Sequence, residues 1–184
     1  MKSGSVIGTA GISKSSAWAN NSPPIIKIPV KRSVLFVCSA NQCRSPMAMA
    51  LFADLVAKKH HPDDWRIESA GCWAMAGMPA TSNAVEAVRK LGLNLEDHRA
   101  QAVTDSLLKQ FQLVLCMEME HKTTLRRNYP EHAGKIHLLS EMSSHLQEID
   151  DPVGQSVERY SSTISKISQF LDAGYPRICD LTKQ

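Results

Sequence analysis

The stretch SVLFVCSANQCRSP, residues 33–46, determines how the rest of the chain is interpreted. Val34–Val37 is an apolar run of β-branched and aromatic side chains, which is typical of a buried central strand in a parallel sheet. After a short loop, Ser45 is expected to cap a helix, which puts Pro46 where its missing N–H does no harm. Apolar side chains then recur every four residues and predict a helix with one apolar face. They are Met47, Leu51 and Leu55.

The loop between this strand and this helix has the pattern C-x5-R-S and suits the binding of an oxyanion. Backbone N–H groups at the start of a helix point into such a loop, and the helix dipole adds partial positive charge. The guanidinium of Arg44 is a planar fork that can bind two oxygens of a phosphate. Cys38 would share this positive field, which favours a reactive thiolate. A cysteine beneath a bound phosphate predicts attack on phosphorus through a phosphocysteine intermediate, with Ser45 donating its hydroxyl to the sulfur as it leaves.

A simpler interpretation of the same loop is a buried cysteine beside an unrelated surface arginine. Two residues at this spacing often match by chance. The apolar strand before Cys38, the Ser-Pro pair after Arg44 and the helical pattern that follows together favour the catalytic interpretation.

The segment VLFVCSANQCRSPMA, residues 34–48, resembles the phosphate loop of the low molecular weight protein tyrosine phosphatases, in their bacterial branch. The resemblance implies that Cys38 is the nucleophile, that Arg44 holds the phosphate, and that a distant Asp-Pro supplies the general acid. It also implies that the loop itself lines the phosphate site. These residues are Ser39, Ala40, Asn41, Gln42 and Cys43. The likeness extends from about Val34 to Ile178, nearly all of the chain after its N-terminal segment.

An Asp-Pro is present in the segment Asp150-Asp151-Pro152-Val153-Gly154, which is similar to the D-P-F-G segment of the bacterial branch. We expect Asp151 to be the general acid because the proline that fixes the geometry follows it directly. Asp151 would protonate the leaving oxygen and then, as a carboxylate, take a proton from the attacking water. Fixed donors would meet the charge on the phosphoryl oxygens, so neither a metal nor a cofactor is expected. The alternative is a plain turn before a helix.

Two further side chains are assigned to the site. Trp73 lies in a Gly- and Met-rich loop after the predicted strand at residues 66–70, where ligands bind in open α/β sheets, and it is a candidate wall for an aromatic substrate. Its alternative role is to cap the core. In the family, a histidine at the position of His98 hydrogen-bonds the loop asparagine, here Asn41, and supports its left-handed turn. The alternative is an exposed loop histidine.

Cys43 lies five residues after Cys38 and is a candidate redox partner. The resemblance implies a reversible disulfide between these two cysteines. The spacing alone does not place the two sulfurs in contact, and Cys43 packing under the loop is the alternative.

Strands and helices alternate along the rest of the chain. Further strands are predicted at residues 113–117 and 136–139, and helices at residues 82–91, 104–110 and from Ser156 onward. This order predicts an α/β fold, a small doubly wound four-stranded parallel sheet with helices on both faces, of the phosphotyrosine phosphatase I-like kind. Residues 31–184 are expected to form a single phosphatase domain. Residues 1–30, rich in small and polar residues, are expected to be a disordered or loosely docked extension.

The composition is that of an ordinary globular protein, with 43% hydrophobic and 21% charged residues. A net charge of +3 does not indicate nucleic-acid binding, and no apolar run approaches the roughly 20 residues of a membrane span. Five cysteines without a paired spacing indicate a reducing compartment. We therefore expect a cytoplasmic enzyme whose partners are phosphorylated proteins.

Gln42 leaves the substrate open. Tyrosine-specific members of the family usually carry a bulky aliphatic residue at this position, and the related protein-arginine phosphatases carry threonine. We expect hydrolysis of phosphotyrosine-type monoesters, with protein-arginine phosphatase as the alternative. A thiol-dependent arsenate reductase on this scaffold would need two further cysteines close together, and none follows Cys116 within ten residues. A non-catalytic phosphoprotein-binding module would have no use for Asp151.

Overall fold

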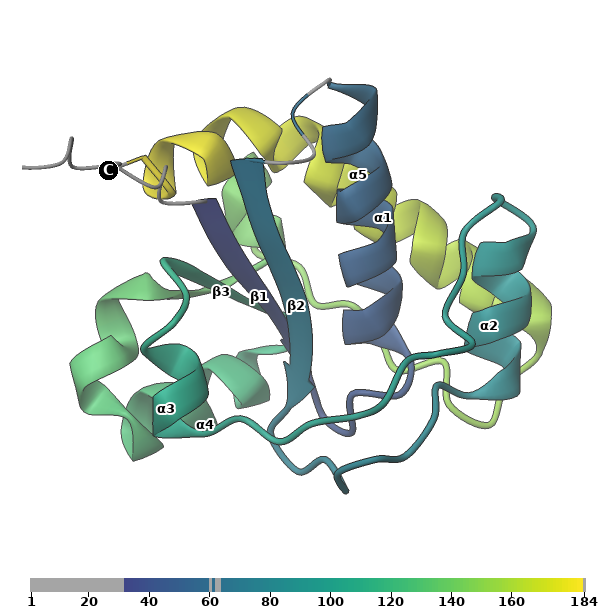
Figure 1. Ribbon diagram of the computed structural model, residues 1–184, viewed down its shortest axis with the longest axis horizontal. Helices are drawn as coiled ribbons and strands as arrows, with labels where there is room; N and C mark the ends of the chain where they lie inside the picture. The colour runs from purple at the N-terminus through teal and green to yellow at the C-terminus, as the bar shows by residue number, and fades with distance from the viewer. Residues whose placement is uncertain (1–31, 60, 62–63, 184) are drawn as a thin grey trace, which may run out of the picture.

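The computed structural model describes residues 32–59, 61 and 64–183. The expected extension over residues 1–30 lies outside this part of the chain. The described residues form a sheet of four parallel strands in the order β2-β1-β3-β4 (Figure 1). These strands are β1 (Arg32–Cys38), β2 (Trp65–Gly71), β3 (Leu113–Cys116) and β4 (Ile136–Leu138). The predicted four-stranded parallel α/β fold is confirmed.

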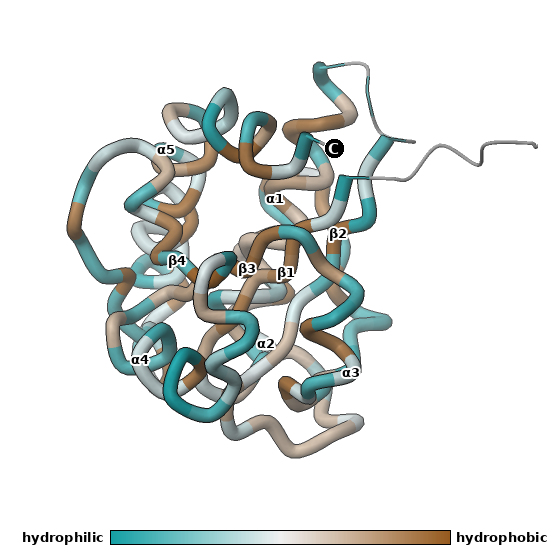
Figure 2. Tube along the Cα trace, turned by 90° about the vertical axis from the view of Figure 1, so that its left-hand side faces the viewer, coloured by the Kyte–Doolittle hydropathy of each residue, from teal (hydrophilic) through white to brown (hydrophobic). Residues whose placement is uncertain are grey.

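Helices cover both faces of the sheet (Figure 1). They are α1 (Arg44–Lys58), α2 (Ser82–Arg89), α3 (Asp105–Leu108), α4 (Met119–Asn128) and α5 (Val157–Leu181), with short 3-10 helices η2 (Pro130–Lys135) and η3 (Ser140–Ser143). Val34 and Phe36 of β1 point into the core shared with α1, α2 and α5, whereas Leu35 and Val37 point into the core shared with α3 and α4. Successive strand side chains face opposite sides of a sheet, so a strand buried on both faces must be apolar throughout. Figure 2 shows the result, with hydrophobic residues gathered along the strands and hydrophilic ones on the outer turns.

Helix α5 is 25 residues long and packs one apolar face on the domain. Tyr160, Ile167 and Ile178 on this face are buried, whereas Glu158 and Asp172 are exposed. Among the described helices, none combines the length and the apolar character needed to cross a lipid bilayer.

The loops that follow the strands meet at the carboxyl edge of the sheet. Trp73 N donates a hydrogen bond to Ser39 O at 2.9 Å, which joins the loop after β2 to the loop after β1. Ile149 N donates to Met117 O at 2.9 Å, which holds the loop before α5 against the end of β3. All strand ends of a parallel sheet share one edge, so these loops converge there although they lie far apart in the sequence.

The start of α1 differs from the prediction that Ser45 caps this helix. The helix begins at Arg44, and Cys43 occupies the N-cap without a side-chain capping hydrogen bond. Ser45 therefore lies inside the first turn, where its hydroxyl is engaged by neighbouring strand and loop atoms. Cys38 and Asn41 precede Ser45 on the same strand and loop, and Ala70 belongs to β2, so a capping pattern, which considers only the residues that follow the cap, does not reveal these contacts.

Candidate active site

Cys38 ends β1, and its side chain lies against the first turn of α1. The residue is only 2% exposed, and its Sγ lies 3.0 Å from Ser45 Oγ. Ser45 Oγ also accepts a hydrogen bond from Asn41 Nδ2 at 2.9 Å and can donate to Ala70 O at 3.2 Å. The sulfur is thus held against the N-terminal turn of α1, at the positive end of the helix dipole.

Asn41 holds the turn of the loop between β1 and α1. Its φ of 56° lies in the left-handed region, which asparagine tolerates better than most residues. Its buried side chain donates from Nδ2 to the hydroxyls of Ser45 and Ser69 and accepts at Oδ1 from Gln101 N, each at 2.9 Å. His98 Nε2 lies 2.7 Å from Asn41 O and must donate, because a carbonyl oxygen only accepts. Burial lowers the pKa of His98.

Gly71, at the end of β2, allows the loop to lie close against the strand. A β-carbon at this position would lie 2.6 Å from Ser39 O and 2.9 Å from Asn41 N. Both are backbone atoms of the loop, so a side chain here would displace the loop from the end of β2.

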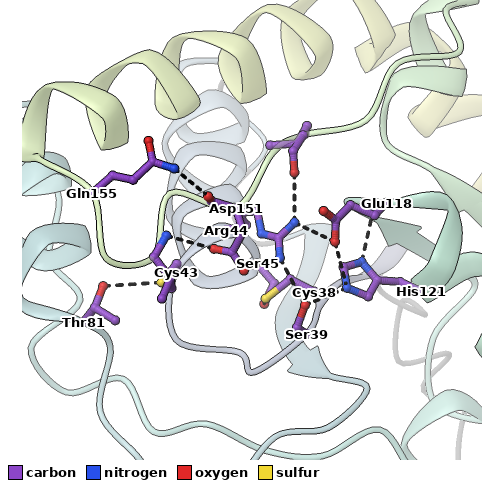
Figure 3. Close-up of polar contacts among 12 residues, drawn as sticks. Cys38, Ser39, Cys43, Arg44, Ser45, Thr81, Glu118, His121, Asp151 and Gln155 are labelled. Atoms are coloured by element: carbon purple, nitrogen blue, oxygen red, sulfur yellow. Dashed lines mark hydrogen bonds and ion pairs between the residues drawn. The ribbon is translucent and has the colours of Figure 1, made fainter.

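Arg44 is the centre of the polar network at the site (Figure 3). Its Nη1 donates to Ile149 O at 2.9 Å and forms an ion pair with Glu118 Oε2 at 2.8 Å. Its Nη2 donates to Ser39 Oγ at 3.1 Å and to Asp151 Oδ2 at 2.5 Å. Both terminal nitrogens of the guanidinium are therefore partnered. Nε is buried and has no acceptor among the described residues. Nε and Nη2 lie on one edge of the guanidinium, which can bind two oxygens of an oxyanion.

Asp151 reaches this edge from the segment before α5. Its Oδ2 contacts Arg44, its Oδ1 accepts from Val153 N at 3.1 Å, and its side chain is 39% exposed. The neighbouring Asp150 instead forms an exposed ion pair with Arg159 at 3.1 Å. Of the two adjacent carboxylates, Asp151 is the one that the fold brings to Arg44.

Glu118 and His121, at the start of α4, complete the network and were missed by the sequence analysis. His121 is fully buried, with Nε2 2.9 Å from Ser39 Oγ and 3.3 Å from Glu118 Oε2. Its Nδ1 accepts from Glu118 N at 3.2 Å. Burial and the nearby charge of Arg44 lower the pKa of His121 to about 4, so the ring is neutral. The Glu-x-x-His spacing after a buried strand was a detectable capping signal, although nothing local placed it beside Arg44.

Cys43 lies beneath the loop, on the side of α2 and α5. Its Sγ lies 3.4 Å from Thr81 Oγ1 and 3.6 Å from Tyr160 Oη. Burial raises the pKa of the Cys43 thiol. All five cysteines of the chain fall within the described residues and are free thiols.

The rim of the site is apolar. Trp73 is 52% exposed, and its ring centroid lies 5.8 Å from that of His121. Met75 and Met78 on the same loop are also exposed, as is Val153 beside the general-acid candidate.

The two remaining predicted loop residues are less constrained. Ala40 is exposed, and Gln42 is half-buried, with its backbone oxygen accepting from Thr81 N at 2.9 Å. This contact ties the loop to the N-cap of α2.

One group of three metal-ligating side chains occurs in the described part of the chain, formed by Asp105, Glu131 and His132. It contains none of the predicted site residues. Asp105 is already paired with Lys109 at 2.6 Å and with His132 at 2.9 Å, so its charge is met by protein groups.

Both the sequence and the fold have relatives among known proteins. Residues 33–175 match the family model described as low molecular weight phosphotyrosine protein phosphatase. The chain is 33% identical over 147 residues to the probable low molecular weight protein-tyrosine-phosphatase EpsP of Ralstonia solanacearum, a match that covers 80% of this chain and 96% of the relative. It is 32% identical over 139 residues to a protein-arginine-phosphatase of Bacillus subtilis, with coverage of 75% and 91%. The fold resembles the crystal structure of a low molecular weight protein tyrosine phosphatase from T. tengcongensis, with a TM-score of 0.76, 38% identity and coverage of 80% and 99%.

Proposed function

The chain belongs to the low molecular weight phosphotyrosine protein phosphatase family and is a cysteine-dependent phosphatase, and we propose that Cys38, Arg44 and Asp151 carry out its reaction. Cys38 Sγ attacks phosphorus, the ester P–O bond breaks, and the leaving oxygen takes a proton from Asp151. Asp151 then takes a proton from a water whose oxygen attacks phosphorus. The P–S bond breaks, which releases inorganic phosphate and returns Cys38 as a thiolate.

One observation carries this proposal, the buried Nε–H of Arg44 that has no acceptor among the described residues. A buried donor without a partner is unfavourable by about 1–3 kcal/mol, and by more when the group is charged. A phosphate at this edge of the guanidinium would bind Nε and Nη2 together and displace Asp151 Oδ2 from Nη2. The displaced carboxyl group would remain beside the phosphate, where a general acid is required.

The loop around the phosphate supplies the other donors in this proposal. The backbone N–H groups of residues 39–44 and the dipole of α1 would meet the charge on the phosphoryl oxygens, so the chemistry requires no metal ion. Asn41 and His98 would hold the loop in its binding conformation.

Ser45 would stabilise the sulfur as a leaving group in the second step. Its hydroxyl carries one proton and has two acceptors within reach, Cys38 Sγ at 3.0 Å and Ala70 O at 3.2 Å. A charged thiolate is the stronger acceptor, so the proton goes to Cys38 whenever the sulfur is ionised.

Cys43 would act as a redox partner in this proposal. A peroxide oxidises the Cys38 thiolate to a sulfenic acid, which condenses with the Cys43 thiol to form the disulfide and release water. In the reduced enzyme, Thr81 and Tyr160 contact the Cys43 sulfur, and this thiol must leave both before the disulfide forms.

The substrate in this proposal is a phosphotyrosine side chain of a protein, with Trp73 as a wall against the ring. The exposed apolar rim formed with Met75, Met78 and Val153 supports this choice, because an aromatic ring gains more from apolar contact than a guanidinium does. The relative in Bacillus subtilis named as a protein-arginine-phosphatase keeps phosphoarginine as the second candidate.

Residues 31–184 would form the single catalytic domain, acting in the cytoplasm. The sheet, with a hydrophobic core on each face, supports a single domain. All five cysteines are free thiols, which suits a reducing compartment.

The test measures phosphate release from phosphotyrosine and phosphoarginine peptides in excess EDTA. Wild type is compared with Cys38→Ser and with the control Cys179→Ser, which alters a cysteine of α5 outside the site. We expect turnover that Cys38→Ser abolishes and Cys179→Ser retains, with phosphotyrosine preferred. Faster release from phosphoarginine would indicate a protein-arginine phosphatase instead. Full activity of Cys38→Ser would overturn the mechanism.

A further inference from the structure

Ser39 and His121 meet at the site although they are 82 residues apart in the sequence. Ser39 is the first loop residue after β1, and His121 lies in the first turn of α4. Their contact, between Ser39 Oγ and His121 Nε2, measures 2.9 Å, and the imidazole is fully buried. Neither the nucleophile nor the general acid takes part in it.

The hydrogen-bonding partners of His121 determine which ring nitrogen carries the proton. Glu118 N is a backbone donor and lies 3.2 Å from Nδ1, so Nδ1 must accept. The proton of the neutral ring is therefore on Nε2, which lies 2.9 Å from Ser39 Oγ and 3.3 Å from Glu118 Oε2, and the hydrogen bond is made to the nearer Ser39 Oγ. The low pKa of His121 agrees with this neutral form.

The Ser39 hydroxyl is thus left as a donor. It receives one hydrogen bond from His121 Nε2 and one from Arg44 Nη2, at 2.9 and 3.1 Å, and these occupy both of its lone pairs. Its own proton cannot point at either partner. Ser39 Oγ shares Arg44 Nη2 with Asp151 Oδ2, so it lies beside the guanidinium edge at which a phosphate would bind.

We propose that His121 is a positioning residue that holds the Ser39 hydroxyl in the orientation in which its proton is donated to a phosphoryl oxygen bound on Arg44. The pair would add one O–H donor to the loop amides and the guanidinium. This inference rests on the proposed function, since it requires a phosphate on Arg44. Hydrogen bonds to charged oxygens are stronger than those between neutral groups, so the loss of this donor is expected to weaken phosphate binding about tenfold.

Two substitutions at position 121 separate this role from a purely structural one. The amide nitrogen of glutamine lies as many bonds from Cβ as Nε2 does, so His121→Gln keeps a donor for Ser39. The amide oxygen of asparagine lies as many bonds away as Nδ1 does, so His121→Asn keeps the acceptor for Glu118 N and loses the contact with Ser39. At position 39, Ser39→Ala removes the hydroxyl and Ser39→Thr restores it.

The experiment measures the Ki of inorganic phosphate as a competitive inhibitor of p-nitrophenyl phosphate hydrolysis, using the full chain. We expect Ser39→Ala and His121→Asn each to raise Ki about tenfold, and Ser39→Thr and His121→Gln to stay within about twofold of wild type. The Ser39→Ala/His121→Asn double variant should be no weaker than either single variant, because both remove the same interaction.

Three results would overturn the proposal: an unchanged Ki in Ser39→Ala, an equal loss in His121→Gln and His121→Asn, or losses that multiply in the double variant. If His121→Asn does not fold, the Ser39→Ala and Ser39→Thr pair decides alone. Turnover that persists without Cys38 would contradict the proposed function itself. An unchanged Ki together with Cys38-dependent turnover would contradict only the role of Ser39 and His121.

Discussion

Replacing His121 with glutamine should remove a pH dependence from the stability of this protein. Burial and the charge of Arg44 lower the pKa of His121 from 6.5 to about 4, and Asp151 acts weakly in the opposite direction. The charged groups that face the ring are Arg44 from α1, Glu118 at the start of α4, and Asp151 from the segment before α5. Between pH 4 and 6.5 the unfolded chain therefore binds a proton at this histidine that the folded protein excludes.

The size of the effect follows from this shift. At about 1.36 kcal/mol for each pH unit, a change from 6.5 to about 4 corresponds to roughly 3 kcal/mol. The free energy of unfolding is therefore lower in acid. The contribution of His121 to it is present in full above pH 6.5, falls as the pH drops toward 4, and levels off below that value. The buried position of the ring preserves the effect, because solvent does not screen it.

The assay is urea denaturation of wild type and His121→Gln at a series of pH values from 4 to 7.5. The free energy of unfolding of wild type minus that of the variant should fall by roughly 3 kcal/mol from pH 7.5 to pH 4. The contributions of all other groups cancel in this difference. His61→Gln, which replaces an exposed histidine, is the control and should follow wild type. A constant difference between wild type and His121→Gln would refute a neutral, desolvated His121.

Four further outcomes are expected. Asp151→Asn should lower kcat/KM on a phosphotyrosine peptide about 100-fold or more and lower kcat/KM on p-nitrophenyl phosphate much less, since that leaving group needs no proton and kcat/KM does not include the later hydrolysis of the phosphocysteine; equal losses in kcat/KM would argue against a general acid. Glu118→Gln should lower kcat/KM about tenfold and the free energy of unfolding by about 1–3 kcal/mol, because it removes the charge of a half-buried partner from the buried Arg44; urea denaturation that matches wild type would contradict this. Cys43→Ala should recover a smaller share of its own initial activity than wild type when peroxide-treated enzyme is reduced with dithiothreitol, because the sulfenic acid then oxidises further; equal recovery would rule out the disulfide. Excess EDTA should leave phosphate release unchanged, because Arg44 and the loop amides supply the positive charge, and inhibition that added metal reverses would refute this.

The central strand and the catalytic loop were predictable because their signals are local. Val34–Val37 is apolar throughout, which only a strand buried on both faces requires, and C-x5-R-S places a cysteine and an arginine on one loop at a helix N-terminus. The parallel sheet followed from the alternation of strand and helix patterns. Ser45 shows the limit of such reasoning. Its sequence context is that of a cap, but its hydroxyl contacts Cys38 and Asn41 on the preceding strand and loop and Ala70 on β2.

The prediction of Asp151 rests on resemblance to a family and on the proline that follows it, because the two adjacent carboxylates are otherwise alike in the sequence. In the fold, Asp151 contacts Arg44 from 107 residues away, and Asp150 pairs with Arg159 at the surface. The role of a carboxylate depends on the groups that surround it. For Asp151, the packing of the loop before α5 against β3 determines those groups.

The sequence by itself determined the fold class and the class of chemistry, and it predicted Cys38 as the nucleophile and Arg44 as the phosphate-binding residue, because periodicity and loop pattern are properties of neighbouring residues. Only the tertiary structure decided which side chains complete the site. Glu118 and His121 have the local appearance of an ordinary helix start, and they become part of the site because β1 and β3 lie side by side with their carboxyl ends at one edge. That juxtaposition places a neutral imidazole against Ser39 and a carboxylate against Arg44, through contacts that span more than 70 residues of chain and leave no local pattern in the sequence.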